Sequence, residues 1–92
     1  MKYVLFVCAP ADEEEPAPTR VTARLRPPAD ATTVRVVGDE VHLGDGPFAR
    51  TEEYIAGLDL VEADDLDEAI ALAAKHSAAL GGGTVEVRPV RE

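Results

Sequence analysis

The feature of this sequence that most constrains its fold is an N-terminal segment, Lys2–Cys8, in which both alternating sets of side chains are apolar. One set is Tyr3, Leu5 and Val7, and the other is Val4, Phe6 and Cys8. Successive side chains of a strand point to opposite faces, so this pattern predicts a central strand that is covered on both faces. The strands that pair with this central strand, and the side chains that pack on its two faces, must then come from other segments.

The chain is short and poor in aromatic side chains. It has 92 residues, of which 46% are hydrophobic but only 4% aromatic, and it has no tryptophan. A chain of this length makes one domain and buries only about 60–65% of its unfolded surface. We therefore expect a single domain over residues 1–92 that gains stability from a second subunit, as a homodimer.

The segment Ala9–Pro18 breaks the apolar pattern abruptly. It contains three prolines and the acidic run Asp12–Glu15. Prolines and like charges favour an extended, self-repelling chain over a helix. We therefore expect residues 9–19 to form an acidic linker without helix. The alternating segment Arg20–Arg26, stopped by two prolines, then predicts a short half-buried strand.

A β-hairpin is predicted where Thr32–Val37 and Glu40–Leu43 flank the two-residue turn Gly38-Asp39. Directly opposite residues of such a pair share a face. The turn therefore predicts one apolar face and one polar face, with the cross-strand pairs Val36 and Val41, Val34 and Leu43, and Arg35 and His42.

The second half of the chain predicts strand, helix and strand. Tyr54–Ala63 is apolar on both faces, and Gly57 marks either a bulge or a close approach. Asp64 or Asp65 is expected to cap a helix that runs to about Ser77. Its expected buried stripe is Leu66, Ala69, Ile70 and Ala73. The glycines 81–83 end this helix, and Thr84–Val90 is the last strand.

The run Asp45-Gly46-Pro47-Phe48 joins the hairpin to the following strand. Asp-Gly-Pro is turn chemistry, because the aspartate side chain accepts backbone N–H bonds and glycine tolerates positive φ. We expect an ordered turn with Phe48 packed inward. Asp45 is either a turn stabiliser of this kind or a ligand-binding or proton-transfer group.

Several short blocks, taken together, resemble the YCII-related family of small bacterial α+β proteins, also called the DGPF domain. They are Leu25–Pro28, Ala31–Arg35, Asp45–Phe48, Glu62–Ala69 and Val85–Val90. The resemblance implies an α+β fold with a ferredoxin-like antiparallel sheet, of the dimeric α+β barrel type. In this chain the acidic linker takes the place of the first helix. The resemblance also implies dimers whose sheets pack face to face.

Members of the family use a histidine on the first helix near the aspartate of the DGPF motif, an acid–base arrangement. Asp45 matches that aspartate, but residues 9–19 contain no histidine. His42, three residues before Asp45, is either a substitute for it or an exposed cross-strand residue. His76 lies near the C-terminus of the predicted helix, where the helix dipole favours a cation. We expect this role for His76 rather than ligand binding.

Cofactor and metal sites are not expected. The acidic runs 12–15 and 64–68 lack the spacing of a calcium loop. The glycines 81–83 follow a helix and precede a strand, the reverse of the order that a phosphate-binding loop requires.

The net charge of −9, from 18 acidic and 9 basic residues, argues against nucleic-acid and anionic-membrane partners. Cys8 is the only cysteine, and no long apolar segment is present, so we expect a cytoplasmic protein.

The leading hypothesis is a non-catalytic dimeric module that binds a small molecule or a protein in a regulatory setting, with Asp45, Gly46, Pro47 and Phe48 as its ligand-binding residues. The alternative is a small lyase-like acid–base enzyme that uses Asp45 with His42 as catalytic residues.

Overall fold

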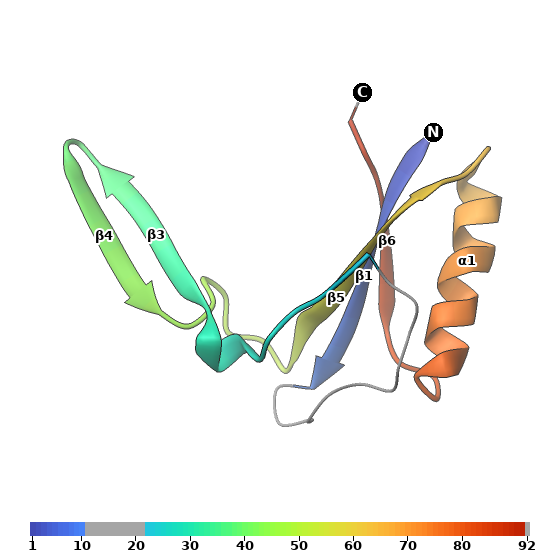
Figure 1. Cartoon of the computed structure of the whole chain (residues 1–92), viewed down its shortest axis with the longest axis horizontal. Coiled ribbons are helices and arrows are strands. Elements are labelled where there is room, and N and C mark those ends of the chain that lie inside the picture. Colours follow the sequence, from blue (N-terminus) through green and yellow to red (C-terminus); the bar gives the residue numbers. More distant parts are fainter. Residues whose placement is uncertain (11–21, 92) are drawn as a thin grey trace.

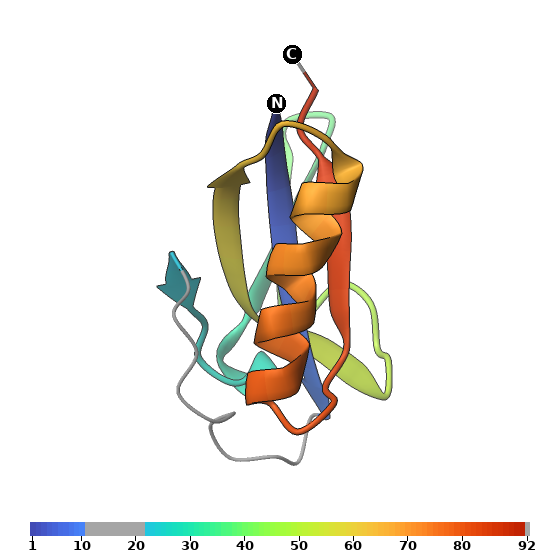
Figure 2. The ribbon, with the colours of Figure 1, turned by 90° about the vertical axis from the view of Figure 1, so that its right-hand side faces the viewer.

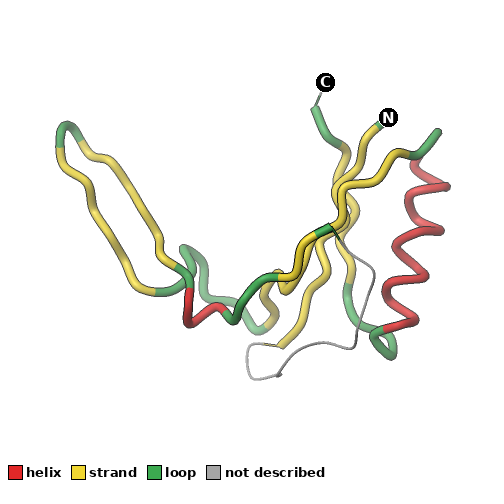
Figure 3. Tube along the Cα trace, in the orientation of Figure 1, coloured by secondary structure: helices red, strands yellow, loops and turns green. Residues whose placement is uncertain are grey.

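The computed structural model describes residues 1–10 and 22–91, which form six strands, one 3₁₀-helix and one α-helix. In chain order the elements are β1 (Lys2–Pro10), β2 (Ala23–Arg24), η1 (Pro28–Asp30), β3 (Thr32–Val37), β4 (Glu40–Asp45), β5 (Glu53–Glu62), α1 (Leu66–Ala79) and β6 (Val85–Pro89). The strands belong to two separate sheets, which Figure 3 shows as two yellow bodies joined by loops.

The larger sheet has four antiparallel strands in the order β2-β5-β1-β6. β1 lies in its interior between β5 and β6, as the sequence predicts. If the β3–β4 hairpin is counted as an insertion, the order is compatible with a ferredoxin-like sheet. The α+β class is therefore confirmed.

The predicted linker overlaps the first strand. β1 continues through Ala9 and Pro10, so the strand is longer at its end than the apolar pattern indicated. The reason is its neighbour: Ala9 and Pro10 lie opposite Tyr54 and Glu53 of β5, and this pairing extends the sheet. The rest of the predicted linker, residues 11–19, lies outside the described residues. The predicted strand 20–26 is described only from residue 22 onward, and within residues 22–26 the strand is β2, two residues long.

One face of the four-stranded sheet packs against α1 (Figures 1 and 2). Tyr3, Leu5 and Val7 of β1 are buried on this face, and Tyr3 forms a core cluster with Ala63 and Ala69. The other set of β1, represented by Val4 and Phe6, is only partly buried. Among the described residues no helix packs on this second face, so the described part of one subunit covers only one face of β1 with a helix. We call the second face the open sheet face.

The helix begins and ends at sequence-encoded caps. The Asp65 carboxylate accepts a hydrogen bond from the Glu68 N–H at 2.9 Å, which makes Asp65 the N-cap. At the other end the Gly81 N–H donates to Ala78 O and the Gly82 N–H to Ser77 O, a Schellman arrangement that the positive φ of Gly81, 69°, permits.

The buried stripe of α1 is narrower than predicted. Ala69 and Ala73 are buried, but Leu66 and Ile70 are each about half exposed. The bulky Tyr3 ring packs opposite the small side chain of Ala69, so the helix approaches the sheet along a narrow row. Leu66 and Ile70 then lie beside the contact rather than within it.

A β-bulge interrupts β5 next to Gly57, one of the two alternatives that the sequence left open. Gly57 lies opposite Val7 and Ile55 lies opposite Cys8, so Ala56 has no opposite residue on β1, and its carbonyl instead accepts a hydrogen bond from the Leu25 N–H at 2.8 Å. The extra residue changes the alternation of the strand. Leu58 and Ile55, three residues apart, therefore share the open sheet face, since they lie opposite Phe6 and Cys8 of β1.

The hairpin β3–β4 has the predicted turn and register, with Val36 opposite Val41 and Arg35 opposite His42. It extends away from the larger sheet as an arm, on the side opposite to α1 (Figure 1). We call it the β3–β4 arm. Thr33 Oγ1 donates to Gly46 O at 2.8 Å, and the Gly46 N–H donates to Ala31 O at 2.7 Å, so the base of the arm is held by hydrogen bonds.

Candidate functional site

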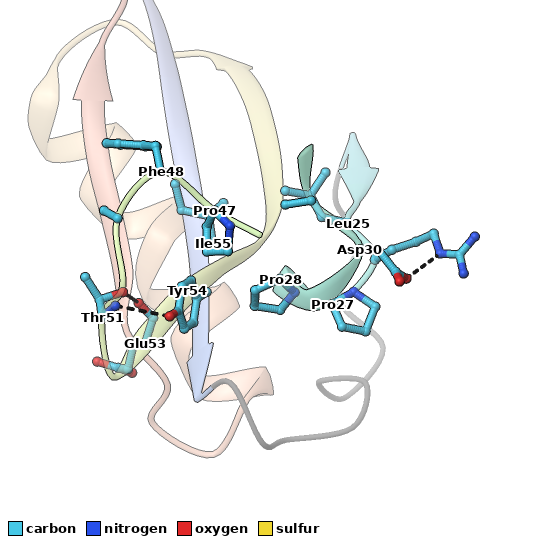
Figure 4. A pocket seen from close by; sticks show the side chains of 13 residues that line it. Leu25, Pro27, Pro28, Asp30, Pro47, Phe48, Thr51, Glu53, Tyr54 and Ile55 are labelled. Carbon is cyan, nitrogen blue, oxygen red and sulfur yellow. Dashed lines mark hydrogen bonds and ion pairs between the residues drawn. The ribbon is translucent and has the colours of Figure 1, made fainter. Parts of the chain in front are cut away.

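A cavity of about 540 Å³ lies at the base of the β3–β4 arm, where the arm joins the four-stranded sheet (Figure 4). Most of its lining is apolar: prolines, alanines, aliphatic side chains and two aromatic rings. The lining residues are Leu25, Arg26, Pro27, Pro28, Asp30, Ala31, Pro47, Phe48, Ala49, Thr51, Glu53, Tyr54 and Ile55.

Three segments distant in sequence meet at this cavity. Leu25–Pro28 follows β2, and two prolines with fixed φ turn the chain into the short helix η1. Pro47–Ala49 enters from the end of β4. Ile55 is placed on the open sheet face by the bulge in β5, so one wall of the cavity continues into that face.

The polar groups of the lining are mostly paired with one another. Arg26 Nε donates to Asp30 Oδ2 at 3.0 Å on the outer side. The Tyr54 hydroxyl accepts from the Thr51 N–H at 3.2 Å, and Thr51 Oγ1 donates to the Glu53 backbone carbonyl. A ligand in this cavity would therefore be bound mainly by contact with apolar side chains.

The four residues of the DGPF run occupy different surroundings. Pro47 and Phe48 line the cavity, whereas Asp45 and Gly46 are not among its lining residues. Phe48 is 90% exposed, so the prediction that it packs inward was wrong.

Asp45 is the last residue of β4 and lies opposite Thr32. Within residues 1–10 and 22–91 its carboxylate makes no hydrogen bond, so the expected bonds to backbone N–H groups are not formed. The turn is held instead through Gly46, whose φ is 92°, and through the hydroxyl of Thr33. The expectation of positive φ at this glycine is confirmed.

His42 does not lie beside Asp45. The two residues are separated by an odd number of positions along β4, so their side chains point to opposite faces of the arm. The His42 ring lies 3.4 Å from Glu40 Oε2 and is exposed. The structure therefore does not bring the two proposed catalytic groups together.

A different histidine does pair with an aspartate. His76 Nε2 lies 3.1 Å from Asp59 Oδ2, between α1 and β5, where the two side chains are only 11% and 18% exposed. Asp59 Oδ1 also accepts a hydrogen bond from Thr22 Oγ1 at 2.8 Å. His76 is in the last turn of α1, as predicted, but its partner was missed. These residues do not line the cavity, and the pair ties the helix to the sheet.

Cys8 lies on the open sheet face and is partly buried. Burial raises the pKa of its thiol, and the nearby charges of Glu53 and Glu86 raise it further. Because the thiolate is the reactive form, this environment disfavours a nucleophilic role.

Within residues 1–10 and 22–91, no three or more histidine, cysteine, aspartate or glutamate side chains gather as metal ligands would. In the same part of the chain, none of the helices has the length and apolar composition needed to cross a bilayer.

The antiparallel sheet, the single described α-helix on one face and the hairpin insertion define a small α+β protein. The chain belongs to the YCII-related family, whose domain model matches residues 1–92. It is also 42% identical over 69 residues to an uncharacterized protein of Rhizobium meliloti (strain 1021). That alignment covers 74% of this chain and 56% of the relative, so the chain spans little more than half of the relative's length.

The sequence did not predict this cavity. Of its lining residues, only Pro47 and Phe48 were predicted to bind a ligand. Its other walls come from residues 25–31 and 51–55, which no local spacing connects with the DGPF run. One signal was present for the histidine–aspartate pair: Asp59 is a charged residue between Leu58 and Leu60 in a strand that is otherwise largely apolar. A carboxylate in that position requires a polar partner.

Proposed function

We propose that this chain is a non-catalytic homodimeric module that binds a small apolar molecule at the base of the β3–β4 arm, in a regulatory setting. The observation that carries this proposal is the cavity of about 540 Å³ with its apolar lining. Sites for small molecules are usually concave and mostly apolar, with volumes of about 300–1,000 Å³. The volume suits a ligand of one or two rings.

The ligand's chemistry follows from the lining. Apolar contact is provided by Leu25, Ile55 and the prolines, whereas Arg26 is already bonded to Asp30. The chain has a net charge of −9, which disfavours an anionic ligand. We therefore propose a neutral molecule that is bound mainly through its apolar surface.

The homodimer is proposed on the open sheet face. Leu60 and Ile55 are about half exposed there, and Val4, Phe6 and Leu58 are partly buried. Exposed apolar patches of several hundred Å² are typical of interfaces rather than of monomer surfaces. A two-fold contact, in which each subunit helps to cover the open sheet face of the other, is the commonest arrangement.

The acid–base enzyme that would use Asp45 with His42 is not our proposal. A general acid–base pair must be within hydrogen-bond reach of the same substrate. Asp45 and His42 point to opposite faces of β4, and neither lines the cavity.

Binding can be tested with N-phenyl-1-naphthylamine, a neutral apolar probe whose fluorescence rises in apolar surroundings. Ala49→Phe places a ring in the cavity, and Ala71→Phe places the same ring on the exposed side of α1 as a control. We expect the Kd of the probe to rise about tenfold or more for Ala49→Phe, a loss of about 1.4 kcal/mol, and to stay unchanged for Ala71→Phe. Equal affinity in the two variants, or no saturable binding to the natural chain, would contradict the proposal.

A further inference from the structure

The β3–β4 arm presents an apolar face that its own chain leaves uncovered. Val34, Val36, Val41 and Leu43 share this face, because the residues of each cross-strand pair lie on the same side. Their exposed fractions are 60%, 64%, 64% and 69%. The opposite face of the arm carries Arg35 and His42, with Val37 next to the turn.

The arm stands apart from the rest of the molecule. In the described residues β3 and β4 pack mainly against each other, and they extend away from the sheet (Figure 1). The radius of gyration is 15.0 Å, whereas a compact chain of this length has about 12 Å. The arm is thus too distant for the described part of its own domain to cover the four aliphatic side chains.

An uncovered hairpin of this kind is unfavourable by itself. An isolated two-stranded hairpin is at best marginally stable in water, and a packing partner is needed for independent stability. Within residues 1–10 and 22–91 both strands of the arm also have an unpaired edge, because no described strand other than β3 and β4 belongs to the small sheet. The arm therefore requires a surface to pack against.

The chain offers a matching surface on its open sheet face. Figures 1 and 2 show α1 and the arm on opposite sides of the four-stranded sheet. A molecule that docks on the open sheet face therefore lies on the same side as the arm. A second copy on the open sheet face would therefore lie next to the arm of the first copy. The open sheet face of the second copy could then contact that arm.

The areas also favour a second copy. Complete burial of a Val or Leu side chain contributes about 1.5–3 kcal/mol. At roughly 25 cal/mol per Å² of apolar surface, this free energy corresponds to about 60–120 Å² of surface removed from water for each side chain. The four side chains of the arm then supply about 250–500 Å², short of the roughly 800 Å² per partner in a stable interface. In a two-fold contact each subunit contributes its arm and its sheet face, and together these can reach the required area.

We infer that the apolar face of the β3–β4 arm packs against the open sheet face of a second copy of this chain, so that the two arms clasp the dimer. This inference rests on the homodimer proposed above and names the segment that holds it together. The residues in contact are Val34, Val36, Val41 and Leu43 of one subunit and the β1–β5 surface around Leu58 and Leu60 of the other. This surface lies beside Phe6, whose ring has the Arg88 guanidinium over it at 5.3 Å.

Charge substitutions on the arm test the clasp with the full chain. Val36→Lys and Val41→Lys place a charge on the apolar face, and Val37→Lys places the same charge at a valine of comparable exposure, 56% against 64%, on the opposite face. We expect the dissociation constant of the dimer, measured by sedimentation equilibrium, to rise about tenfold or more for the first two variants. For Val37→Lys it should stay within about twofold. Far-UV circular dichroism checks that each variant is folded.

A second measurement locates the contact. The photo-crosslinking residue p-benzoylphenylalanine is placed at position 41 in unlabelled chains, which are mixed with ¹⁵N-labelled natural chains. We expect crosslinks from unlabelled position 41 to labelled peptides that contain β1 or β5. Crosslinks confined to a single chain would overturn the inference.

The outcomes separate the two proposals. If the natural chain is a dimer whose dissociation constant is unaffected by Val36→Lys and Val41→Lys, the clasp is wrong and the sheet-face dimer stands. If the natural chain is a monomer at every concentration tested, both proposals are wrong.

Discussion

Gly46 connects the β3–β4 arm to the loop that lines the cavity, and its backbone conformation depends on the absence of a side chain. Its φ is 92°, a region that residues with a Cβ rarely adopt. Its N–H and its carbonyl both form hydrogen bonds at the base of the arm. A change here alters the position of the arm without removing any packed side chain.

We expect Gly46→Ala to destabilise the base of the arm by about 1–2 kcal/mol, the cost of a left-handed conformation for a residue with a Cβ. The effect comes from the backbone, because a Cβ at position 46 would meet no atom within 4 Å. Gly44→Ala is the control, since its Cβ would make only an ordinary contact with Thr33 at 3.9 Å. Hydrogen exchange of the arm amides measures the difference, and equal protection in both variants would show that the conformation of Gly46 is unimportant.

Cys8 gives a prediction that depends on pH. Burial, and after it the charges of two neighbouring carboxylates, raise the pKa of its thiol above that of a free cysteine. The folded chain therefore holds the proton at pH values where the unfolded chain has lost it. This contribution to stability is complete below the unfolded pKa and is lost as the pH rises toward the folded pKa.

We expect iodoacetamide to alkylate Cys8 more slowly in the folded chain than in urea at pH 8–9, because less thiolate is present. The rate of the folded chain should continue to rise at a pH where that of the unfolded chain has levelled off. A folded-state rate profile that levels off at the same pH as the unfolded one would contradict a raised pKa.

Among the elements, α1 is positioned by its caps and by one polar contact rather than by a wide apolar stripe. Only Ala69 and Ala73 are buried along it, and each contributes a small side chain. His76 near its end is bonded to Asp59 of β5. The N-cap hydrogen bond of Asp65 is therefore expected to contribute a large part of the free energy that stabilises this helix.

Two neighbouring aspartates allow a matched test of the cap. Asp65 bonds to the Glu68 N–H, whereas Asp64 is exposed and lies outside the helix. We expect Asp65→Ala to lower the free energy of unfolding by about 0.5–2 kcal/mol, and Asp64→Ala to change it by a few tenths at most. Urea denaturation measures both changes. Equal effects would indicate that only the charge near the helix N-terminus matters.

The molecule as a whole is elongated, with extents of 44 × 34 × 19 Å. Its four-stranded sheet has α1 on one face, and the arm extends on the other side (Figure 1). Among the described residues the buried core consists of Tyr3, Leu5, Val7 and alanines, so only three of its side chains are larger than that of alanine. Such a core favours stabilisation by a second subunit.

We expect light scattering after size exclusion at low micromolar concentration to report about twice the chain mass of 9.8 kDa. The physical reason is the apolar surface of the open sheet face and of the arm, which one subunit leaves exposed. Leu60→Lys, on the open sheet face, should shift the equilibrium toward the monomer. A stable, well-folded monomer of the natural chain would defeat the argument.

The local patterns of the sequence determined the elements and their nearest pairings. Apolar side chains in both alternating sets identified β1 as an interior strand, and the Gly38-Asp39 turn set the register of β3 with β4. An aspartate and a pair of glycines marked the two ends of α1. These features depend on residues that are close in sequence or joined by a short turn, so a single chain contains the information for them.

The tertiary structure alone decided which surfaces are covered. Phe48 is exposed, and Asp45 and His42 lie apart. The cavity exists because the bulge at Ala56, the Pro27-Pro28 turn and the end of the arm come together. The pairing of His76 with Asp59 likewise depends on how α1 lies across the sheet. Burial and side-chain pairing depend on what lies opposite a residue in space, and periodicity along the chain specifies only the side to which that residue points.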